Sequence, residues 1–140
     1  MTDNSKPVSL KQLRMSFGRF AAGTLAYTVC VFALAILWHL VLFAETYKTI
    51  NYIGRAEPLF EFGLLSIFTQ AVVINGAVWH FGKRHANAII IGLGVYHWSC
   101  HVVAATAKNQ IDLIGLFFAL ETCYLSIQFL IARVVVHLIH

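Results

Sequence analysis

The stretch ANAIIIGLGVYHWSCHVVAATA, residues 86–107, contains 22 residues without a formal charge. An α-helix needs about 20 apolar residues to cross the hydrocarbon core of a bilayer, so this stretch predicts a membrane-spanning helix. Its centre nevertheless carries His97 and His101, which are four residues apart and therefore share one face of a helix. Polar groups are costly in lipid and usually face a partner or a cavity. The stretch therefore predicts a membrane protein with a polar interior.

Three other apolar runs of similar length predict three further spans. The predicted spans cover residues 20–43, 59–81, 86–107 and 111–132. The composition agrees with this reading, because 59% of the 140 residues are hydrophobic and only 11% are charged, against about 25% in soluble proteins. We therefore expect an all-α fold, an integral membrane four-helix bundle over residues 20–140. The basic leader, residues 1–19, is expected to precede it and could form a short interfacial helix.

The distribution of basic residues predicts the orientation of the bundle. The leader and the turn after the second span hold six Lys or Arg, whereas the first loop and the turn after the third span hold three. Because basic residues collect on the cytoplasmic side, we expect both termini to be cytoplasmic in a multi-pass protein of the cell inner (plasma) membrane. The net charge of +4 is modest. Bases at membrane ends contact anionic lipid, so the bilayer is the expected partner and nucleic acid is not.

This topology places a polar side chain of every span in the outer half of the membrane. The residues concerned are His39, Glu61, His101 and Glu121, with Gln70 and His97 nearer the middle. In the fourth span, Glu121, Tyr124 and Gln128 recur at spacings of three and four, which predicts one polar stripe. We predict that these side chains meet inside the bundle and bind a ligand.

Three interpretations of this cluster stay open. In the first, a polar pocket binds or passes a small solute, a proton or a lipid headgroup, with Glu121 as central acceptor, since intramembrane ionisable groups are usually functional. In the second, the same side chains hydrogen-bond across the bundle and fix its register. In the third, the protein is a metal- or haem-binding redox protein. His97 and His101 would chelate a metal, or one of them would pair with His39 across a haem.

The sequence offers little support for catalysis or for a resident cofactor. It contains no nucleophile elbow, no phosphate-binding glycine loop and no dinucleotide fingerprint, and the Glu-x-x-His pairs of di-iron bundles are missing. We therefore expect a non-enzymatic protein without a cofactor. A chain of 140 residues leaves little room for a solute path, so the alternative function is an accessory or assembly subunit of a membrane complex. A homo-oligomer would also supply that room.

Two details of the spans have simpler explanations. Gly92 and Gly94 lie within an apolar helix, where glycine permits close helix packing. His39 follows Trp38 near the end of the first span, and aromatic residues at such positions commonly anchor to headgroups. For His39, headgroup anchoring is thus the alternative to a place in the polar cluster.

Two stretches carry a family resemblance. YIGRAEP at residues 52–58 leads into FGLLSIFTQ at 62–70, and Ala107-Lys108 precedes a span with Glu121. They resemble small bacterial four-span membrane proteins of unknown function. That family has Arg-x-Glu-Pro before the second span, a glutamine within it, Ala-Lys after the third span and a glutamate in the fourth. The resemblance implies the four-span fold but no activity, and it points to Arg55, Glu57, Gln70, Lys108 and Glu121 as site residues.

The charges selected by the resemblance have a physical interpretation as well. Arg55, Glu57 and Lys108 are predicted at the outer surface, above Glu61 and Glu121. Arg55 and Lys108 would pair with these acids as a polar lid, or bind an anionic headgroup at the entrance. The alternative is ordinary snorkelling of long basic side chains at the membrane surface.

Overall fold

The computed structural model describes the backbone of residues 10–52, 60–108 and 111–140, and the side chains of residues 17–52, 60–107 and 111–140. The regular structure in these ranges is entirely helical, which confirms the predicted all-α class. The four long helices are α1 (Leu10–Ile36), α3 (Phe60–Phe81), α4 (Ala86–Lys108) and α5 (Ile114–Ile139). Three short elements join them: the π-helix η1 (Leu37–Leu42), α2 (Ala44–Thr49) and the 3₁₀ turn η2 (Lys83–His85).

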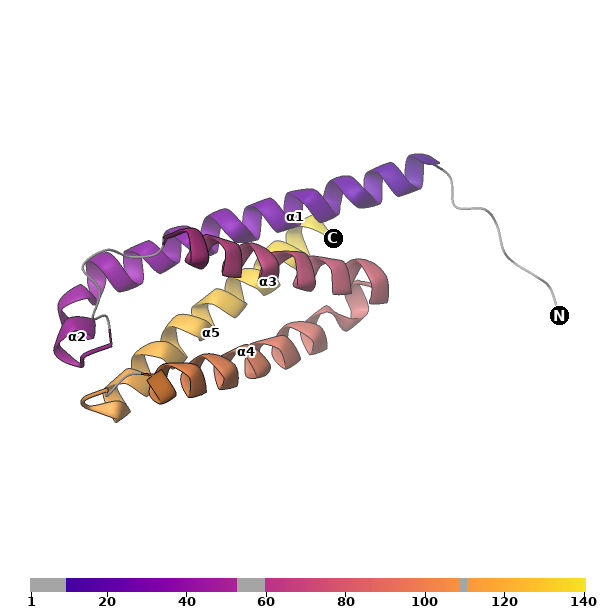
Figure 1. The fold of residues 1–140 in the computed structure, drawn as a ribbon. Coiled ribbons are helices and arrows are strands. Elements are labelled where there is room, and N and C mark those ends of the chain that lie inside the picture. The colour runs from indigo at the N-terminus through magenta and orange to yellow at the C-terminus, as the bar shows by residue number, and fades with distance from the viewer. Residues whose placement is uncertain (1–9, 53–59, 109–110) are drawn as a thin grey trace.

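The long helices run alternately up and down in one bundle (Figure 1). α1 packs mainly against α3 and α5, and α4 packs mainly against α5 and α3. The bundle therefore has two ends. We call the end with α2 and the α4–α5 turn the α2 end, and the end with η2 and the last turn of α5 the η2 end. At the η2 end, α1 extends past the C-terminus of the chain (Figure 1).

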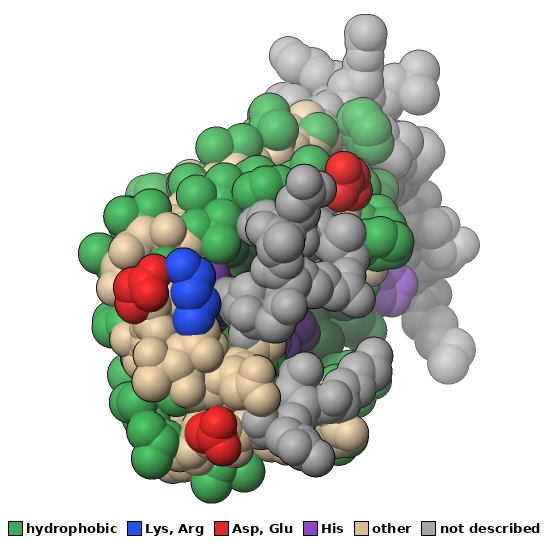
Figure 2. Space-filling view, turned by 60° about the vertical axis from the view of Figure 1, so that its left-hand side comes forward, with side chains coloured by type: hydrophobic (Ala, Val, Ile, Leu, Met, Phe, Trp, Pro, Cys, Tyr) green, Lys and Arg blue, Asp and Glu red, His purple; other side chains and the backbone are tan. Residues whose placement is uncertain are grey.

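Within the part of the chain that the structure describes, four helical segments are long and apolar enough to cross a membrane. They are Phe17–Leu42, Phe60–Phe81, Lys83–Ala107 and Ile114–Ile139. Many large apolar side chains on these segments are exposed, as in a helix surface that faces lipid. Figure 2 looks toward the α2 end, where hydrophobic side chains cover the flanks and charged ones appear at the end itself. These features support a multi-pass membrane protein.

The observed helices differ from the predicted spans at two places. α1 begins at Leu10, so the second half of the leader is continuous with the first span. The fourth span was expected over residues 111–132, but α5 begins at Ile114 and continues to Ile139. The later start follows from Leu113, which has a left-handed backbone (φ 51°) that an α-helix does not accommodate.

A glycine makes the tight connection between α3 and α4. Gly82 has a φ of 86°, a value that other residues rarely adopt, and its N–H donates to the carbonyl of Val78 at 2.8 Å. Because glycine has no Cβ, the chain can leave the helix here with this positive φ without a steric penalty. The turn makes α3 and α4 antiparallel neighbours, as the sequence predicts.

Among the side chains that the structure describes, two buried clusters form the core. The cluster nearer the η2 end is mostly aliphatic: Tyr27, Val31, Ile67, Ala71, Ile74, Val78, Ala86, Ile90, Ala132, Val135 and Val136. The cluster nearer the α2 end is rich in aromatic residues: Trp38, Tyr47, Ile50, Ala105, Phe117, Leu120, Tyr124 and Leu125. The polar site described next is embedded in this aromatic cluster.

Candidate functional site

The first span ends in a π-helical turn that sets up the site. The N–H of Phe43 donates to the carbonyl of Trp38 at 3.0 Å, five residues back instead of four. π-Turns are rare and occur frequently at functional sites. After Phe43 the chain continues into α2, so that Trp38, His39 and Tyr47 pack around the interior of the α2 end.

Glu121 is the centre of the site and has no exposed surface. Its Oε1 accepts a hydrogen bond from the hydroxyl of Tyr47 at 2.5 Å, and its Oε2 lies 2.6 Å from Nε2 of His101. Nε2 of His39 lies 3.5 Å from Oε1. Four elements, η1, α2, α4 and α5, thus bring one side chain each to a single point. We call Glu121, Tyr47, His39 and His101 the Glu121 centre.

Tyr47 is held as a hydrogen-bond donor to the carboxylate. The indole N–H of Trp38 donates to the Tyr47 hydroxyl at 3.1 Å, so the hydroxyl hydrogen is directed at Glu121. Burial, and then the negative charge of Glu121, raise the pKa of Tyr47 well above its usual range. The same two causes raise the pKa of Tyr52. Both phenols therefore stay neutral, and Tyr47 keeps its proton available for donation.

Aromatic rings enclose the imidazole of His39. Its ring stacks on Tyr47 with centroids 4.9 Å apart, and it meets Tyr124 edge-on at 4.7 Å. Nδ1 of His39 lies 3.0 Å from the carbonyl oxygen of Ala35. A carbonyl only accepts hydrogen bonds, so Nδ1 carries a hydrogen and Nε2 is the nitrogen that faces Glu121.

A second polar group lies deeper in the bundle. The side-chain amide of Gln128 donates to the Tyr27 hydroxyl at 3.0 Å and also to Oε1 of Gln70. The Tyr27 hydroxyl donates to the same Gln70 oxygen at 3.2 Å. The Gln70 amide nitrogen lies 3.4 and 3.5 Å from the two ring nitrogens of His97. We call Gln70, Gln128, Tyr27 and His97 the glutamine layer.

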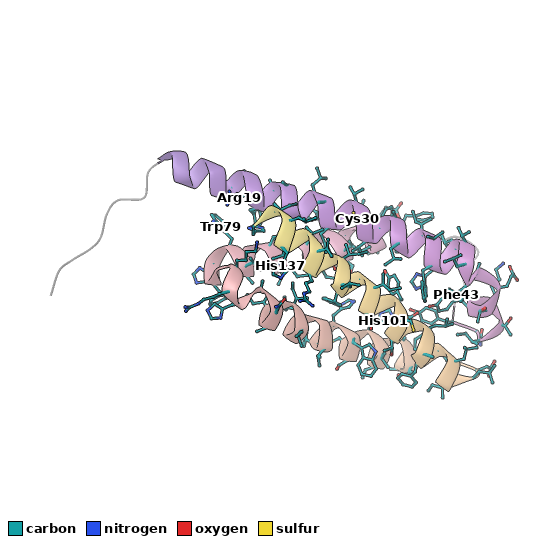
Figure 3. All side chains as sticks on the ribbon, turned by 180° about the vertical axis from the view of Figure 1, so that it is seen from behind. Arg19, Cys30, Phe43, Trp79, His101 and His137 are labelled. Carbon is teal, nitrogen blue, oxygen red and sulfur yellow. The ribbon has the colours of Figure 1, made fainter. Side chains whose placement is uncertain are left out.

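The two polar groups are connected along α4. The rings of His97 and His101 are nearly parallel, with centroids 6.0 Å apart. Figure 3 shows His101 toward the end of the bundle that holds Phe43, whereas His137 and Trp79 lie toward the other end. A cavity of about 160 Å³ adjoins the glutamine layer between α3 and α4, and Gln70 and His97 are among its lining residues.

The predicted site residues are thus divided among several places. Glu121 and His101 belong to the Glu121 centre, and Gln70, Gln128 and His97 belong to the glutamine layer. Tyr124 is buried and packs against His39. The predicted partnership of Glu121 with both His97 and His101 is therefore only half right, because His97 contacts Gln70 instead.

The predicted outer charges do not enter the described site. Glu61 is exposed in the first turn of α3 and is not among the partners of Glu121. Arg55 and Glu57 lie outside the described residues, and so does the side chain of Lys108 at the end of α4. The polar lid therefore stays a prediction.

Two members of the site were missed or misread in the sequence. The anchoring interpretation of His39 and Trp38 is wrong, because His39 faces Glu121 and Trp38 is buried against Tyr47. The π-turn that rotates them inward has no sequence signal. Tyr47 was overlooked because it lies in a loop, where no hydrophobic period indicates which side chains point inward.

The geometry does not support the metal or haem interpretation. Among the side chains that the structure describes, no group of three or more His, Cys, Asp or Glu is arranged to hold a metal ion. The Nε2 atoms of His39 and His101 are both directed at the Glu121 carboxylate, and His97 is next to Gln70. The haem pairing of His39 with His97 or His101 therefore stays a prediction.

Comparison of the chain with family models, curated proteins and solved structures found no match. The resemblance to small bacterial four-span proteins therefore stays a prediction. What the protein does has to be inferred from the chemistry of the Glu121 centre and of the glutamine layer.

Proposed function

We propose that this protein binds and passes protons, with the Glu121 centre as its proton-holding site. The observation that carries the proposal is the contact between His39 and Glu121. Nδ1 of His39 donates to Ala35, so Nε2 of a neutral ring would present a lone pair to Oε1 of an ionised Glu121 at 3.5 Å. Two acceptors repel one another. One proton, on the imidazole or on the carboxyl, makes the contact attractive.

The other contacts of Glu121 allow this proton to move. Oε2 is 2.6 Å from Nε2 of His101, a distance at which a proton is shared by a strong charge-assisted hydrogen bond. His101 in turn faces His97 at a ring separation of 6.0 Å, a gap that one bridging water or a ring rotation would close. Chains of acidic and histidine side chains of this kind form the proton relays of membrane pumps and transporters.

The basic residues support an orientation for this relay. Lys83 and Arg84 are exposed at the η2 end, and α1 begins at the same end (Figure 1). The positive-inside rule favours a cytoplasmic η2 end, with both termini inside. The Glu121 centre then lies in the outer half of the bilayer, in the cell inner (plasma) membrane.

Proton flux into liposomes tests the proposal directly. The purified protein would be reconstituted with a pH-sensitive dye inside, and flux would be driven by an imposed pH gradient with valinomycin to balance charge. We expect Glu121→Gln to lower the flux to that of protein-free liposomes, because the amide cannot release a proton. Circular dichroism and thermal unfolding would show that the variant stays folded.

Glu61→Gln is the matched control, since Glu61 is an exposed carboxyl in the first turn of α3. Its flux should equal that of the wild type. Unchanged flux in folded Glu121→Gln would overturn the proposal, and so would an equal loss in both variants, which would indicate a general effect of removing acidic charge.

A second function, binding of a small solute, is favoured by the cavity beside the glutamine layer. Its volume of about 160 Å³ and its lining by Gln70, His97 and Thr69 suit a small molecule with one hydrogen-bonding group. Val73→Phe, at an apolar lining position, would fill the cavity while leaving the Glu121 centre intact. If proton flux depended on a co-transported solute, this variant would lose flux. Retained flux would limit the function to protons.

A further inference from the structure

The surface between α4 and α5 carries a groove that is separate from both polar groups. It has a volume of about 560 Å³ and mostly apolar walls. It extends from Asn87 and Arg133 near the η2 end to Trp98 and Thr122 in the middle of the helices. Both helices that form it are long and apolar enough to span a membrane, so in a bilayer the groove would face lipid.

The length of the groove matches one leaflet of a bilayer. Asn87 and Trp98 are eleven positions apart along α4, and Thr122 and Arg133 are eleven positions apart along α5. At 1.5 Å per residue each wall is about 16 Å long, roughly half of a hydrocarbon core of about 30 Å. The indole N–H of Trp98 donates to the Thr122 hydroxyl at 3.0 Å, and this contact closes the groove at its deep end.

The floor of the groove depends on a glycine. A Cβ added to Gly94 would lie 3.2 Å from Cγ of Phe129, so the absence of a side chain there lets the Phe129 ring pack directly on α4. Ile91, Val95 and Leu130 line the sides and are exposed. The result is an apolar channel that polar solutes would not occupy.

The shallow end of the groove is positively charged. Arg133 is exposed there and forms no ion pair with any residue that the structure describes. Lys83 and Arg84 are exposed in the turn at the same end. Basic pockets between membrane helices commonly bind anionic lipid headgroups.

We propose that this groove binds an anionic phospholipid, with one acyl chain between α4 and α5 and the headgroup phosphate paired with Arg133. An acyl chain begins at the headgroup level and ends in the middle of the bilayer, as the groove does. A helix from a second copy of the chain would run the full membrane thickness and would extend past the end closed by Trp98 and Thr122. The charge at Arg133 selects an anionic lipid over a zwitterionic one.

Native mass spectrometry of the full-length protein would test this inference. The protein would be released from detergent containing equal amounts of palmitoyl-oleoyl phosphatidylglycerol and palmitoyl-oleoyl phosphatidylcholine. We expect one phosphatidylglycerol to stay bound, with a preference of about fivefold or more from one basic contact. Arg133→Gln should abolish the preference, whereas Ser126→Phe, a bulky substitution in the groove, should reduce the binding of both lipids.

Arg84→Gln is the matched control, because Arg84 is exposed at the same end but does not line the groove. It should retain the preference. Equal binding of both lipids by the wild type would overturn the inference, as would full phosphatidylglycerol binding by folded Arg133→Gln or by folded Ser126→Phe. If Arg84→Gln lost the preference for phosphatidylglycerol as fully as Arg133→Gln, the lipid would be attracted to the whole basic end and not to this groove. A lipid-free dimer that Ser126→Phe dissociates would identify a second copy as the occupant.

Discussion

The Glu121 centre and the glutamine layer are two buried polar groups on the same helix, yet they differ in chemistry. Glu121 and Gln128 are seven residues apart on α5, which places them about 10 Å apart on one face. Both side chains are almost completely buried. The partners of Glu121 include two histidines, whereas those of Gln128 are Tyr27 and Gln70.

This difference separates a group centred on a carboxyl and two imidazoles from one centred on two neutral amides and a phenol. Amide and hydroxyl groups satisfy one another without any change of charge, which suits the fixing of helix register. A carboxylate between two imidazoles has several protonation states of similar geometry. His97 contacts Gln70 and stacks near His101, so it lies between the two groups.

The largest contrast should come from truncating the central residue of each group. Glu121→Ala would leave Tyr47, His39 and His101 without their common partner, and we expect a loss of about 3–5 kcal/mol in the free energy of unfolding. Gln128→Ala should cost less, about 1–3 kcal/mol, because it leaves only neutral groups unpaired. Reversible unfolding in mixed micelles would measure both. Equal losses would contradict the distinction between an ionic and a neutral group.

Removing one hydroxyl would sharpen the picture of the Glu121 centre. Tyr47→Phe removes the donor to Oε1 and leaves the indole N–H of Trp38 unpaired, so we expect about 1–3 kcal/mol of destabilisation. The raised pKa of Tyr47 keeps it protonated below pH 10, so the difference from the wild type should be constant from pH 7 to about 9. Thermal unfolding across that range would check this. A difference that grows or shrinks between pH 7 and 9 would mean that Tyr47 titrates.

A double-mutant cycle would isolate the glutamine layer. We expect Gln70→Leu and Gln128→Leu to couple by about 0.6 kcal/mol, and at most about 1.7 kcal/mol, as polar pairs between membrane helices do. Amides do not titrate, so the coupling energy should be the same at pH 5 and pH 8. The free energy of unfolding of the wild type, the two single variants and the double variant, measured at both pH values, gives the coupling energy. A coupling that changes with pH would contradict a pairing made by the two neutral amides alone.

The smallest effect is expected at the η2 end, where His140 lies 3.1 Å from Oδ1 of Asn75. Burial, and then the positive charges of Arg19 and Lys83, lower the pKa of His140. The unfolded chain therefore takes up a proton more readily than the folded protein. The contribution of neutral His140 to the free energy of unfolding is therefore complete above about pH 6.5. It is lost as the pH falls below that value.

His140→Asn should abolish this loss, with a difference from the wild type within about 0.5 kcal/mol at pH 7.5. The free energy of unfolding of both proteins, measured at pH 7.5 and pH 5, would show whether the variant lacks the loss of stability at low pH. An unchanged pH dependence in the variant would assign the loss to another histidine.

Part of the site follows from patterns that the chain carries locally. Helical spacing puts His97 and His101 on one face, and alternating spans bring Glu121 to the depth of His101, where they meet at 2.6 Å. Helix geometry is regular within a span, so position along the chain converts into depth with little ambiguity.

The remaining partners depend on irregular backbone. His39 reaches Glu121 because the chain forms a π-turn over Leu37–Leu42, and Tyr47 reaches it because α2 packs onto the end of the bundle. No periodicity extends through a π-turn or a short loop helix, so the direction of these side chains cannot be derived from spacing.

The amino-acid sequence dictates four apolar helices with a polar side chain in each, because the length and polarity of every span are local properties. The packing of the helices selects which polar groups pair. It makes Glu121, with no exposed surface, the common partner of Tyr47, His39 and His101, and it leaves Glu61 exposed. A buried charge is stable only where several elements supply partners at once, and that condition is met only after the helices have packed together.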